Sequence, residues 1–417
     1  MSIGYACKLI GVSNTDMKSC TLKNASIERL TELIKYNINS LSNIIDYNIE
    51  NNIKLFRISS DLIPFGSSEV NNIKWWEIFQ KELGYIGKKI KDSGMRVSMH
   101  PGQYTVLNSN KKEVVKRAVD DLIYHTRILD SMGLNQEHKI VIHIGGAYDS
   151  KILSTERFVK NYKLLSEEVK KRLIIENDDK IYNIEEVLNI GTDNNIPVVF
   201  DNLHNEVNAP EIRMSEIHWI NKCRDTWKKE DGIQKIHYSQ QAEGKKTGSH
   251  SDFIVINEFM TFYKIINRDI DIMLEVKDKN LSCIKCMNCT APNLKISQLE
   301  AEWSKYKYTV LEKSHNKYNE IREYLKNKNN ISASIFYTLL EEALKSEGSK
   351  GSQVNSLLHV WGYFKNSASC MERESFFRDL EKFEANQIRI SAVKKHLKKL
   401  SEKYDSQYIL NSYYFSI

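Results

Sequence analysis

The sequence lacks a long apolar run, since no stretch approaches the roughly 20 apolar residues that a membrane-spanning helix needs. Its first residues, Met1-Ser-Ile-Gly-Tyr5, lack the charged and then apolar segments of a secretory signal. Cysteine is scarce, and its seven residues are odd in number and irregularly spaced, which argues against a disulfide framework. We therefore expect a reduced, cytoplasmic protein with no membrane partner.

A strong charge of either sign is also missing. The formal net charge of +6 over 417 residues is mild and does not by itself indicate a nucleic-acid binder. Bound divalent cations would add positive charge that this count omits. Apolar residues make up 41% of the chain, and its length suits a barrel of about 250 residues plus a smaller domain.

What the sequence does contain is a regular alternation of short apolar runs and segments of helical period. The apolar runs are Ile3–Cys7, Leu55–Ser59, Arg96–Met99, Ile140–Ile144, Leu173–Glu176, Pro197–Asp201, Lys235–Ser239 and Asp271–Glu275. The helical segments between them include Ile27–Ile49, Trp75–Lys91, Val114–Leu129 and Phe158–Lys170. This strand–helix alternation predicts an α/β fold, in which parallel strands close into a TIM (β/α)8 barrel with the helices outside.

From about Glu300 the pattern changes to helices joined by polar links. The predicted helices are Trp303–Leu325, Ile335–Glu347, Gln353–Phe364, Phe376–Ala385 and Val393–Tyr404. No strand alternation is evident before the aromatic C-terminus. We therefore expect a barrel domain over residues 1–297 and a separate, mostly α-helical domain over residues 298–417.

Side chains of the kinds that bind metals stand at the ends of six apolar runs, and two more follow closely. They are His100, His143, Glu176, Asp201, His204, His237, His250 and Glu275. A single histidine at a strand end is more often a hydrogen-bonded core residue, but this constellation favours a metal site, because a closed barrel gathers its strand ends at one mouth. Imidazole and carboxylate without thiolate suit Mn, Zn or Fe, and the number of ligands predicts two or three ions.

Such a cluster has two plausible reactions. Clustered divalent ions make hydroxide from bound water near neutral pH and stabilise both the attacking and the leaving oxygen of a phosphodiester. The residues therefore leave open the hydrolysis of a phosphate ester and the isomerisation of a sugar through a metal-held enediolate. Lys235 lies two positions before His237 on a predicted strand, so both side chains should face the barrel interior.

A run of three cysteines, Cys283-Ile-Lys-Cys286-Met-Asn-Cys289, has a spacing that could seed an iron–sulfur cluster. No fourth cysteine stands near it in the sequence. The favoured interpretation is a helix after the eighth strand with three small apolar thiols on one face.

Over roughly residues 1–295, the order and spacing of several motifs resemble the UV-damage endonuclease family. These motifs are Gly4-Tyr5-Ala6-Cys7, Phe56-Arg-Ile-Ser-Ser60, His100-Pro-Gly-Gln-Tyr104, Ile142-His143, Ile175-Glu176-Asn177-Asp178, Asp201-Asn-Leu-His204, Lys235-Ile-His237-Tyr238-Ser239 and Met273-Leu-Glu275-Val-Lys277. The resemblance implies a barrel related to endonuclease IV and xylose isomerase. It also implies a DNA repair activity that nicks one strand immediately 5′ of pyrimidine dimers or 6-4 photoproducts, and also at abasic sites, leaving a 3′-hydroxyl and a 5′-phosphate.

The same resemblance implies roles for single residues. The eight predicted ligands match the family's metal ligands, with manganese as the expected ion. We expect Glu176, His237 and Glu275 to act in catalysis, together with Lys235, which matches a family lysine that can be carboxylated. The expected partner is double-stranded DNA with UV lesions, bound by a monomer.

Three further positions match residues on the lesion side of the site. Gln103 and Tyr104 match a pair that enters the duplex opposite the lesion, although spacing alone would place Tyr104 in a packed rim. Tyr5 matches a further lesion-side residue. The chain departs from the family pattern after the second strand, where Pro64–Glu69 contains no histidine, and at Leu9, where some relatives have asparagine.

The tail resembles a small bacterial domain of unknown function, the YbgA-like domain. The resemblance is in Tyr306-Lys-Tyr308, in Leu358-His-Val-Trp-Gly-Tyr-Phe-Lys365 and in Tyr408-Ile-Leu-Asn-Ser-Tyr-Tyr414. We expect a helical module that extends the DNA footprint or mediates assembly.

Two alternatives remain beside the repair endonuclease. A sugar isomerase or epimerase on the same barrel would need a closed, sugar-sized pocket, whereas the Gln103–Tyr104 pair and the long loop between His237 and His250 favour an open groove. A non-catalytic damage-binding scaffold would not need to retain so many metal ligands.

Overall fold

The computed structural model describes residues 1–148, 150–328 and 331–417. The described residues form two compact units. The first comprises residues 1–9, 13–254 and 262–284, and the second comprises residues 10–12, 255–261 and 285–417. All the described strands belong to the first unit. Among the described residues, no helix combines the length and the apolar character that crossing a membrane requires.

The first unit is built on eight parallel strands. They are β1 (Ile3–Ala6), β2 (Leu55–Ile58), β3 (Arg96–Met99), β4 (Ile140–His143), β5 (Leu173–Glu176), β6 (Val198–Val199), β7 (Lys235–Tyr238) and β8 (Asp271–Leu274). They pair in the order β6-β5-β4-β3-β2-β1-β8-β7. The two edge strands meet where the His237 amide donates to the Phe200 carbonyl at 2.9 Å, beside a parallel bridge between Asp201 and His237. The sheet is therefore the barrel that the sequence predicted.

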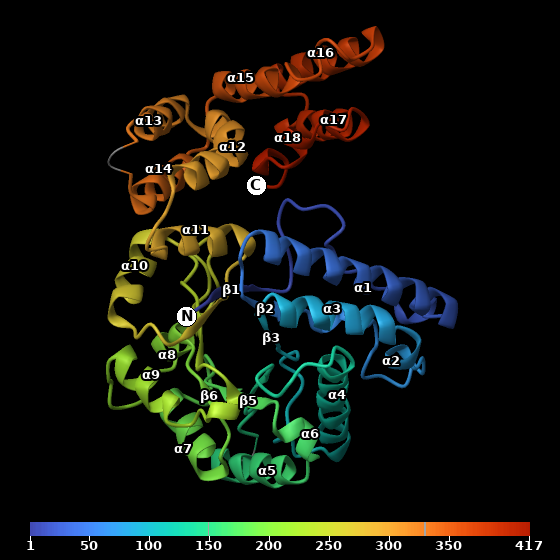
Figure 1. The fold of residues 1–417 in the computed structure, drawn as a ribbon, viewed down its shortest axis with the longest axis vertical. Helices are drawn as coiled ribbons and strands as arrows, with labels where there is room; N and C mark the ends of the chain where they lie inside the picture. Colours follow the sequence, from blue (N-terminus) through green and yellow to red (C-terminus); the bar gives the residue numbers. More distant parts are fainter. Residues whose placement is uncertain (149, 329–330) are drawn as a thin grey trace. The chain divides into compact units, whose positions relative to one another are not determined.

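Helices surround these strands, as Figure 1 shows for α1, α3, α4, α5, α7 and α9. The helices that follow the strands are α1 (Ile27–Glu50), α2 (Trp75–Ile78), α3 (Gln80–Asp92), α4 (Lys112–Ser131), α5 (Lys151–Lys163), α6 (Glu167–Lys170), α7 (Ile184–Asn194), α8 (Asn202–Val207), α9 (Glu216–Arg224), α10 (Ile256–Ile265) and α11 (Asn280–Thr290). Because the strands are covered on both faces, their side chains are almost all buried, as in β5 and β8. The predicted segments Trp75–Lys91 and Phe158–Lys170 are each two helices rather than one.

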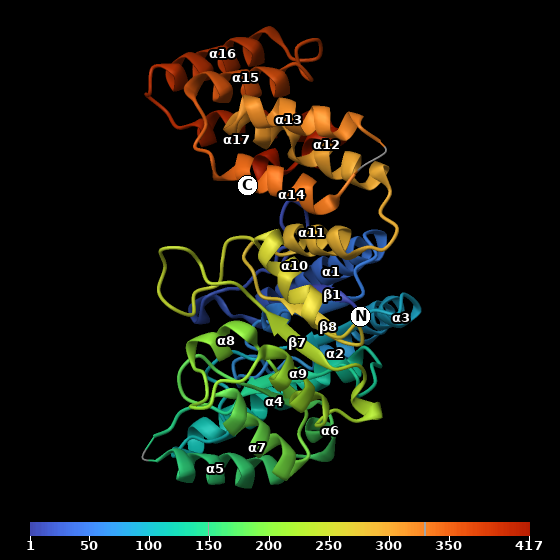
Figure 2. The same cartoon turned by 90° about the vertical axis from the view of Figure 1, so that its left-hand side faces the viewer.

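The second unit is helical, and Figure 2 shows its helices packed on one another. They are α12 (Ile296–Lys313), α13 (His315–Lys326), α14 (Ala333–Lys345), α15 (Lys350–Trp361), α16 (Cys370–Glu384), α17 (Ile390–Lys403) and α18 (Gln407–Leu410). Its core includes Trp361 stacked on Phe376, with ring centroids 4.5 Å apart. The aromatic C-terminus ends in a 3-10 turn that buries Tyr413 and Tyr414.

The prediction of one helix over Trp303–Leu325 was wrong. Ser314 has an extended backbone, with φ −155° and ψ 107°, and it ends α12. Its hydroxyl then accepts a hydrogen bond from the Lys317 amide and so caps α13. The side chain of such a serine replaces a hydrogen bond that the helix backbone would otherwise make, and so it ends one helix and begins the next. The spacing of the apolar residues continues through the break and does not show it.

The three cysteines of the run lie in helix α11, as the favoured interpretation of the sequence predicted. Cys283 and Cys286 are buried, and all seven cysteines of the chain are thiols outside disulfides. Burial raises the pKa of the Cys283 thiol far above its usual value and that of Cys289 to about 12. Burial thus favours the protonated, apolar form of Cys283 and Cys289, as expected of thiols packed in a helix.

Two glycines in α3 provide a matched test of barrel packing. A Cβ at Gly84 would meet open space, whereas a Cβ at Gly87 would lie 1.7 Å from the Met132 carbonyl oxygen at the end of α4. We expect Gly84→Ala to raise the free energy of unfolding by about 0.5–1 kcal/mol, because alanine favours the helix. Gly87→Ala should lower it by at least about 2 kcal/mol through the backbone clash. Calorimetry of both variants checks this, and shifts of the same sign would contradict the packing.

Candidate metal centre

The predicted ligands lie at the carboxyl ends of neighbouring barrel strands. His143 and Glu176 are the last residues of β4 and β5, and they are register partners in the sheet. His100 follows directly after β3, and Glu275 follows β8. Because neighbouring strands pair in parallel, these run ends lie at the same end of the barrel.

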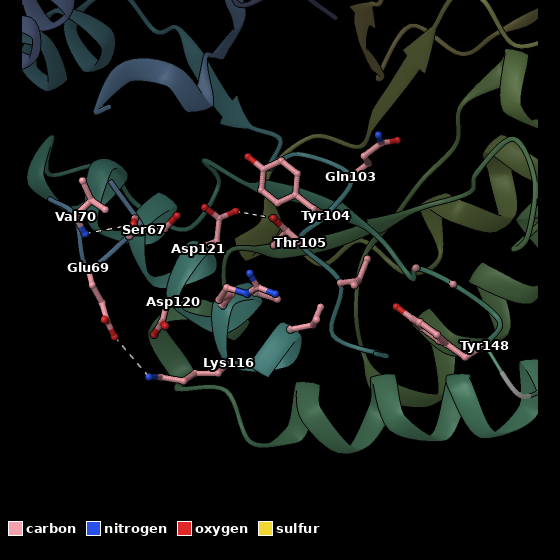
Figure 3. A pocket seen from close by; sticks show the side chains of 17 residues that line it. Ser67, Glu69, Val70, Gln103, Tyr104, Thr105, Lys116, Asp120, Asp121 and Tyr148 are labelled. Carbon is pink, nitrogen blue, oxygen red and sulfur yellow. Dashed lines mark hydrogen bonds and ion pairs between the residues drawn. The ribbon is translucent and has the colours of Figure 1, made fainter. Parts of the chain in front are cut away.

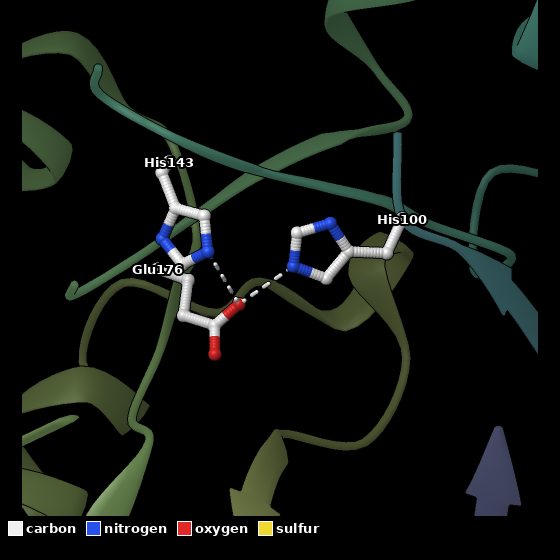
Figure 4. A group of neighbouring side chains, drawn as sticks. All are labelled: His100, His143 and Glu176. Carbon is white, nitrogen blue, oxygen red and sulfur yellow. Dashed lines mark hydrogen bonds and ion pairs between the residues drawn. The ribbon is translucent and has the colours of Figure 1, made fainter. Parts of the chain in front are cut away.

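Glu176 stands at the middle of this group and is 1% exposed. Its Oε2 atom lies 3.1 Å from His100 Nε2 and 3.9 Å from His143 Nε2, as Figure 4 shows. Its Oε1 atom lies 2.8 Å from His237 Nδ1 and 3.8 Å from His204 Nδ1. One buried carboxylate therefore contacts imidazoles from four different segments of the chain.

A second carboxylate, Asp201, is held by the start of α8. Its Oδ1 atom accepts a hydrogen bond from the His204 amide at 2.8 Å, so Asp201 caps the helix on which His204 lies. The His204 Nδ1 atom lies 2.9 Å from the Asn177 carbonyl oxygen and 3.8 Å from Asp201 Oδ1. The Asn177 amide group also bonds to the Asp201 backbone at both ends, which fixes the position of Asp201 against β5.

The third carboxylate, Glu275, contacts two imidazoles, those of His237 and His250. His237 Nδ1 is 3.2 Å from Glu275 Oε1, and His250 Nδ1 is 3.8 Å from Glu275 Oε2. His250 belongs to the long loop after β7, where it forms an antiparallel bridge with Gln241. The structure thus brings all eight predicted ligands into one connected cluster.

The donor atoms suit bound cations. Three groups each place one ligand atom per residue within 4.8 Å of the others: His100, His143 and Glu176; Glu176, Asp201 and His204; and Glu176, His237 and Glu275. In addition, Asp201 Oδ2 and His237 Nε2 are buried and have no hydrogen-bond partner among the described residues. Buried polar atoms are rarely left unpartnered in a native protein, so both are free to bind a metal ion.

The electrostatics of the cluster fit the same interpretation. Burial alone would raise the pKa of the Glu176 carboxyl, but the imidazoles, His237 foremost, outweigh it and hold this pKa well below its usual value. Burial lowers the pKa of His100 to about 4, so this imidazole is neutral near pH 7. Burial also opposes charge on His204, yet the carboxylates of Asp201 and Glu176 outweigh it and raise its pKa to about 9. A bound cation would take the place of that proton.

Two cations inside the barrel lie beside the cluster. Lys235 is fully buried, and burial, followed by the charges of Arg96 and Arg57, lowers the pKa of its amine well below the usual value. Arg57, on β2, forms an ion pair with Glu275. The sequence interpretation gave Arg57 and Asn177 no role. An arginine in an apolar strand is unusual, and this was the signal that could have identified Arg57.

The rim residues occupy different environments. Gln103 and Tyr104 are exposed, Tyr104 at 74%, in the loop that follows His100. A cavity of about 350 Å³ reaches from Gln103 to His100, His143 and His204. On its other side, this loop borders a hollow of about 1010 Å³, in which Figure 3 shows Tyr104 above Thr105 and Asp121. The exposure of Tyr104 agrees with a binding role rather than with a packed rim.

Tyr5 does not reach this rim. Its side chain is fully buried, packs 5.2 Å from the Phe56 ring and donates a hydrogen bond from its hydroxyl to Asn48 Oδ1 at 2.7 Å. The structure therefore does not bring it together with Gln103 and Tyr104. Leu9 is likewise buried, and the loop at Pro64–Glu69 offers no imidazole.

Comparison with known proteins decides the family. The model of the UV-endonuclease UvdE family matches residues 2–307. A UV DNA damage endonuclease of Clostridium perfringens (strain 13 / Type A) is 40% identical over 425 residues, which cover 100% of both chains. This chain belongs to the UV-endonuclease UvdE family. A UV DNA damage endonuclease of Bacillus cereus (strain Q1) is 33% identical over 62% of this chain and 82% of the relative.

The solved structures agree with this assignment to the UvdE family. The crystal structure of SacUVDE has a TM-score of 0.66 and 38% sequence identity, and the match covers 69% of this chain and 96% of that chain. Residues 307–417 match a family described as protein of unknown function (DUF1722). The family membership identifies the chain as a UV-damage repair endonuclease, and the expected C-terminal domain of unknown function is confirmed.

The raised pKa of His204 leads to a prediction for the protein stripped of metal. The folded-state pKa of about 9 exceeds the unfolded value of about 6.5, so the protonated imidazole contributes stability that is full below pH 6.5 and lost as the pH rises toward 9. We expect His204→Gln to lower the free energy of unfolding by about 2–3 kcal/mol at pH 6 and little at pH 9.5. Urea unfolding with a chelator at both values measures this. Exposed His359→Gln is the control, and an equal loss at both pH values for His204→Gln would contradict the assignment.

Proposed function

We propose that this endonuclease nicks double-stranded DNA immediately 5′ of pyrimidine dimers and 6-4 photoproducts, and also at abasic sites, leaving a 3′-hydroxyl and a 5′-phosphate. Membership of the UvdE family supports the repair of UV damage. The observation that supports hydrolysis most directly is the contact of one buried carboxylate, Glu176, with four imidazoles beside two further carboxylates. We expect the barrel domain, residues 1–297, to contain this activity in a cytoplasmic monomer.

The activity depends, in this proposal, on two or three divalent ions, with manganese the preferred one. The residues that would hold them are His100, His143, Glu176, Asp201, His204, His237, His250 and Glu275. When bound, such ions supply hydroxide near neutral pH and stabilise charge on the oxygens of the scissile phosphodiester. The unpartnered Asp201 Oδ2 and His237 Nε2 atoms support this assignment.

The chain's own groups prepare the site for this chemistry. Glu176 is kept ionised by the imidazoles around it, and Arg57 keeps Glu275 ionised by direct pairing. Burial favours the neutral amine of Lys235, which is the form that takes up carbon dioxide to become a carbamate. We propose that Lys235 acts beside the ions, either as this carbamate or as an amine paired with a carboxylate of the cluster.

Lesion recognition falls, in this proposal, to Gln103 and Tyr104. A photoproduct distorts the duplex and weakens stacking, so extruding it costs less than extruding intact bases. The exposed ring of Tyr104 and the amide of Gln103 would fill the space left in the duplex. Gln103 lies on the wall of the cavity that contains His100 and His143, and Tyr104 follows it in the chain and faces the neighbouring hollow, so probing would occur beside cleavage. Tyr5 could join them only if its hydroxyl left Asn48.

The sugar isomerase or epimerase alternative is not favoured. It would need an enclosed pocket around the cluster, and the family model and the full-length relative that match this chain are those of UV endonucleases. A non-catalytic scaffold is disfavoured because every predicted ligand stands in the cluster. Incubation of the protein with manganese and UV-irradiated plasmid distinguishes the three, since only the endonuclease relaxes the supercoil.

Removal of the shared carboxylate should stop catalysis without removing binding. We expect Glu176→Gln to reduce nicking of UV-irradiated plasmid to background, because the neutral amide lacks the negative charge that would hold divalent ions, while lesion binding in a gel-shift assay stays largely intact. His143→Ala should behave in the same way. The exposed carboxylate variant Glu77→Gln is the matched control and should retain full activity. Full activity in Glu176→Gln would contradict the metal roles.

Removal of the exposed Tyr104 ring should weaken lesion binding and leave the nicking rate largely unchanged. Tyr104→Ala should weaken binding of a lesion duplex by about 1–3 kcal/mol, or roughly 5- to 150-fold, by analogy with other base–aromatic contacts. The nicking rate at saturating enzyme should change much less. Tyr85→Ala, which removes another exposed tyrosine of the barrel, should leave both unchanged. The proposed probing role fails if Tyr104→Ala affects only the rate.

A further inference from the structure

Helix α17 in the second unit is the most basic helix of that unit. It contains five lysines and a single acid, Glu402, within its 14 residues. Its apolar residues Val393, Leu397 and Leu400 recur at helical spacing and are buried in the core of the unit. The lysines must therefore occupy the remaining faces of the helix.

One of these faces borders a hollow of about 430 Å³. Ser391, Lys394, Lys395 and Lys398 line it from α17, in the positions that share one helix face, together with Ile390 and the segment 415–417. Lys399 follows Lys395 by one turn and is exposed. The hollow therefore gathers three lysines, beside the half-buried ring of Phe415 and the Ile417 carbonyl oxygen, which accepts a hydrogen bond from Lys394 Nζ at 3.4 Å.

Only some of these lysines have an acidic partner. Lys394 pairs with Glu312 at 3.2 Å and lies 4.3 Å from the centre of the Tyr414 ring, so its charge is used within the unit. Lys403, at the end of the helix, pairs with Glu372 at 2.6 Å. Lys395, Lys398 and Lys399 are exposed and form no ion pair within the part of the chain that the structure describes.

We propose that Lys395, Lys398 and Lys399 bind the phosphate backbone of double-stranded DNA, so that the C-terminal domain adds a sequence-independent contact to the substrate. The proposal rests on the proposed DNA substrate. Three neighbouring unpaired lysines complement a polyanion that has one charge per roughly 1.7 Å of duplex. Duplex is favoured over single strands because the one aromatic side chain that lines the hollow, Phe415, is half-buried and offers unpaired bases no exposed face on which to stack.

The test compares two triple variants of the full-length chain. Lys395→Gln, Lys398→Gln and Lys399→Gln together remove the unpaired charges. Lys317→Gln, Lys326→Gln and Lys403→Gln remove the same number of charges, each of which pairs with a glutamate of the unit. Binding of one duplex, with and without a UV lesion, is measured by anisotropy between 50 and 200 mM salt.

We expect the first variant to weaken binding of both duplexes by at least about tenfold at 100 mM salt and to reduce the slope of log K against log salt by about 2–3, since each phosphate contact contributes about 0.9. The control variant should change neither. Equal losses in both variants, or an unchanged slope in the first, would overturn the proposal and indicate another partner, such as an acidic protein. The difference between the two variants on the undamaged duplex reports on this surface, and nicking of irradiated plasmid by the unaltered chain reports on the proposed function, so the two failures are distinguishable.

Discussion

The burial of one carboxylate organises the mouth of this barrel. Glu176 is almost fully removed from water, and an isolated ion in that position would cost several kcal/mol. The surrounding imidazoles reverse this penalty, because they lower its pKa and approach both of its oxygens. A negative charge that must be neutralised, surrounded by nitrogen and oxygen donors, is the arrangement that a cation completes.

Barrel closure makes that arrangement possible. The ligands come from segments more than 170 residues apart, and they meet because each strand pairs in parallel with its neighbour in a fixed register. The last link is the hydrogen bond from the His237 amide to the Phe200 carbonyl, which joins β7 to the segment after β6. That link places Asp201 beside His237, so closure and assembly of the cluster depend on the same residues.

Much of this arrangement was predictable from the sequence, because all strands of a parallel barrel end at the same mouth. Strands covered on both faces are apolar throughout, so their ends are visible in the sequence, and the ends of β3 and β5 were predicted correctly. The six predicted ligands at strand ends follow from this rule, because strand ends converge at one mouth, whereas His204 and His250 lie beyond the strand ends, in α8 and in the loop after β7. The prediction of one helix over Trp303–Leu325 was wrong because the Ser314 cap divides the segment into two helices. The spacing of the apolar residues is the same on both sides of the cap and gives no sign of it.

Other features of the site depend on contacts that the sequence does not show. The pairing of Arg57 with Glu275 joins residues 218 positions apart. Tyr5 and Tyr104 look alike in the sequence, but one is buried against Phe56 and the other is exposed on a loop. Exposure of a tyrosine depends on which face of a strand or loop it occupies, and it follows only from the assembled fold. A lesion-side role for Tyr5 stays a prediction.

The central claim is that cations bind between the donors around Glu176. The most direct measurement is a crystal structure of the protein grown with manganese, with diffraction recorded on both sides of the manganese absorption edge. The account predicts two or three anomalous peaks, each at bonding distance from Glu176 or its neighbouring imidazoles and carboxylates. An absence of peaks there, with the donors still hydrogen-bonded to one another, would contradict it.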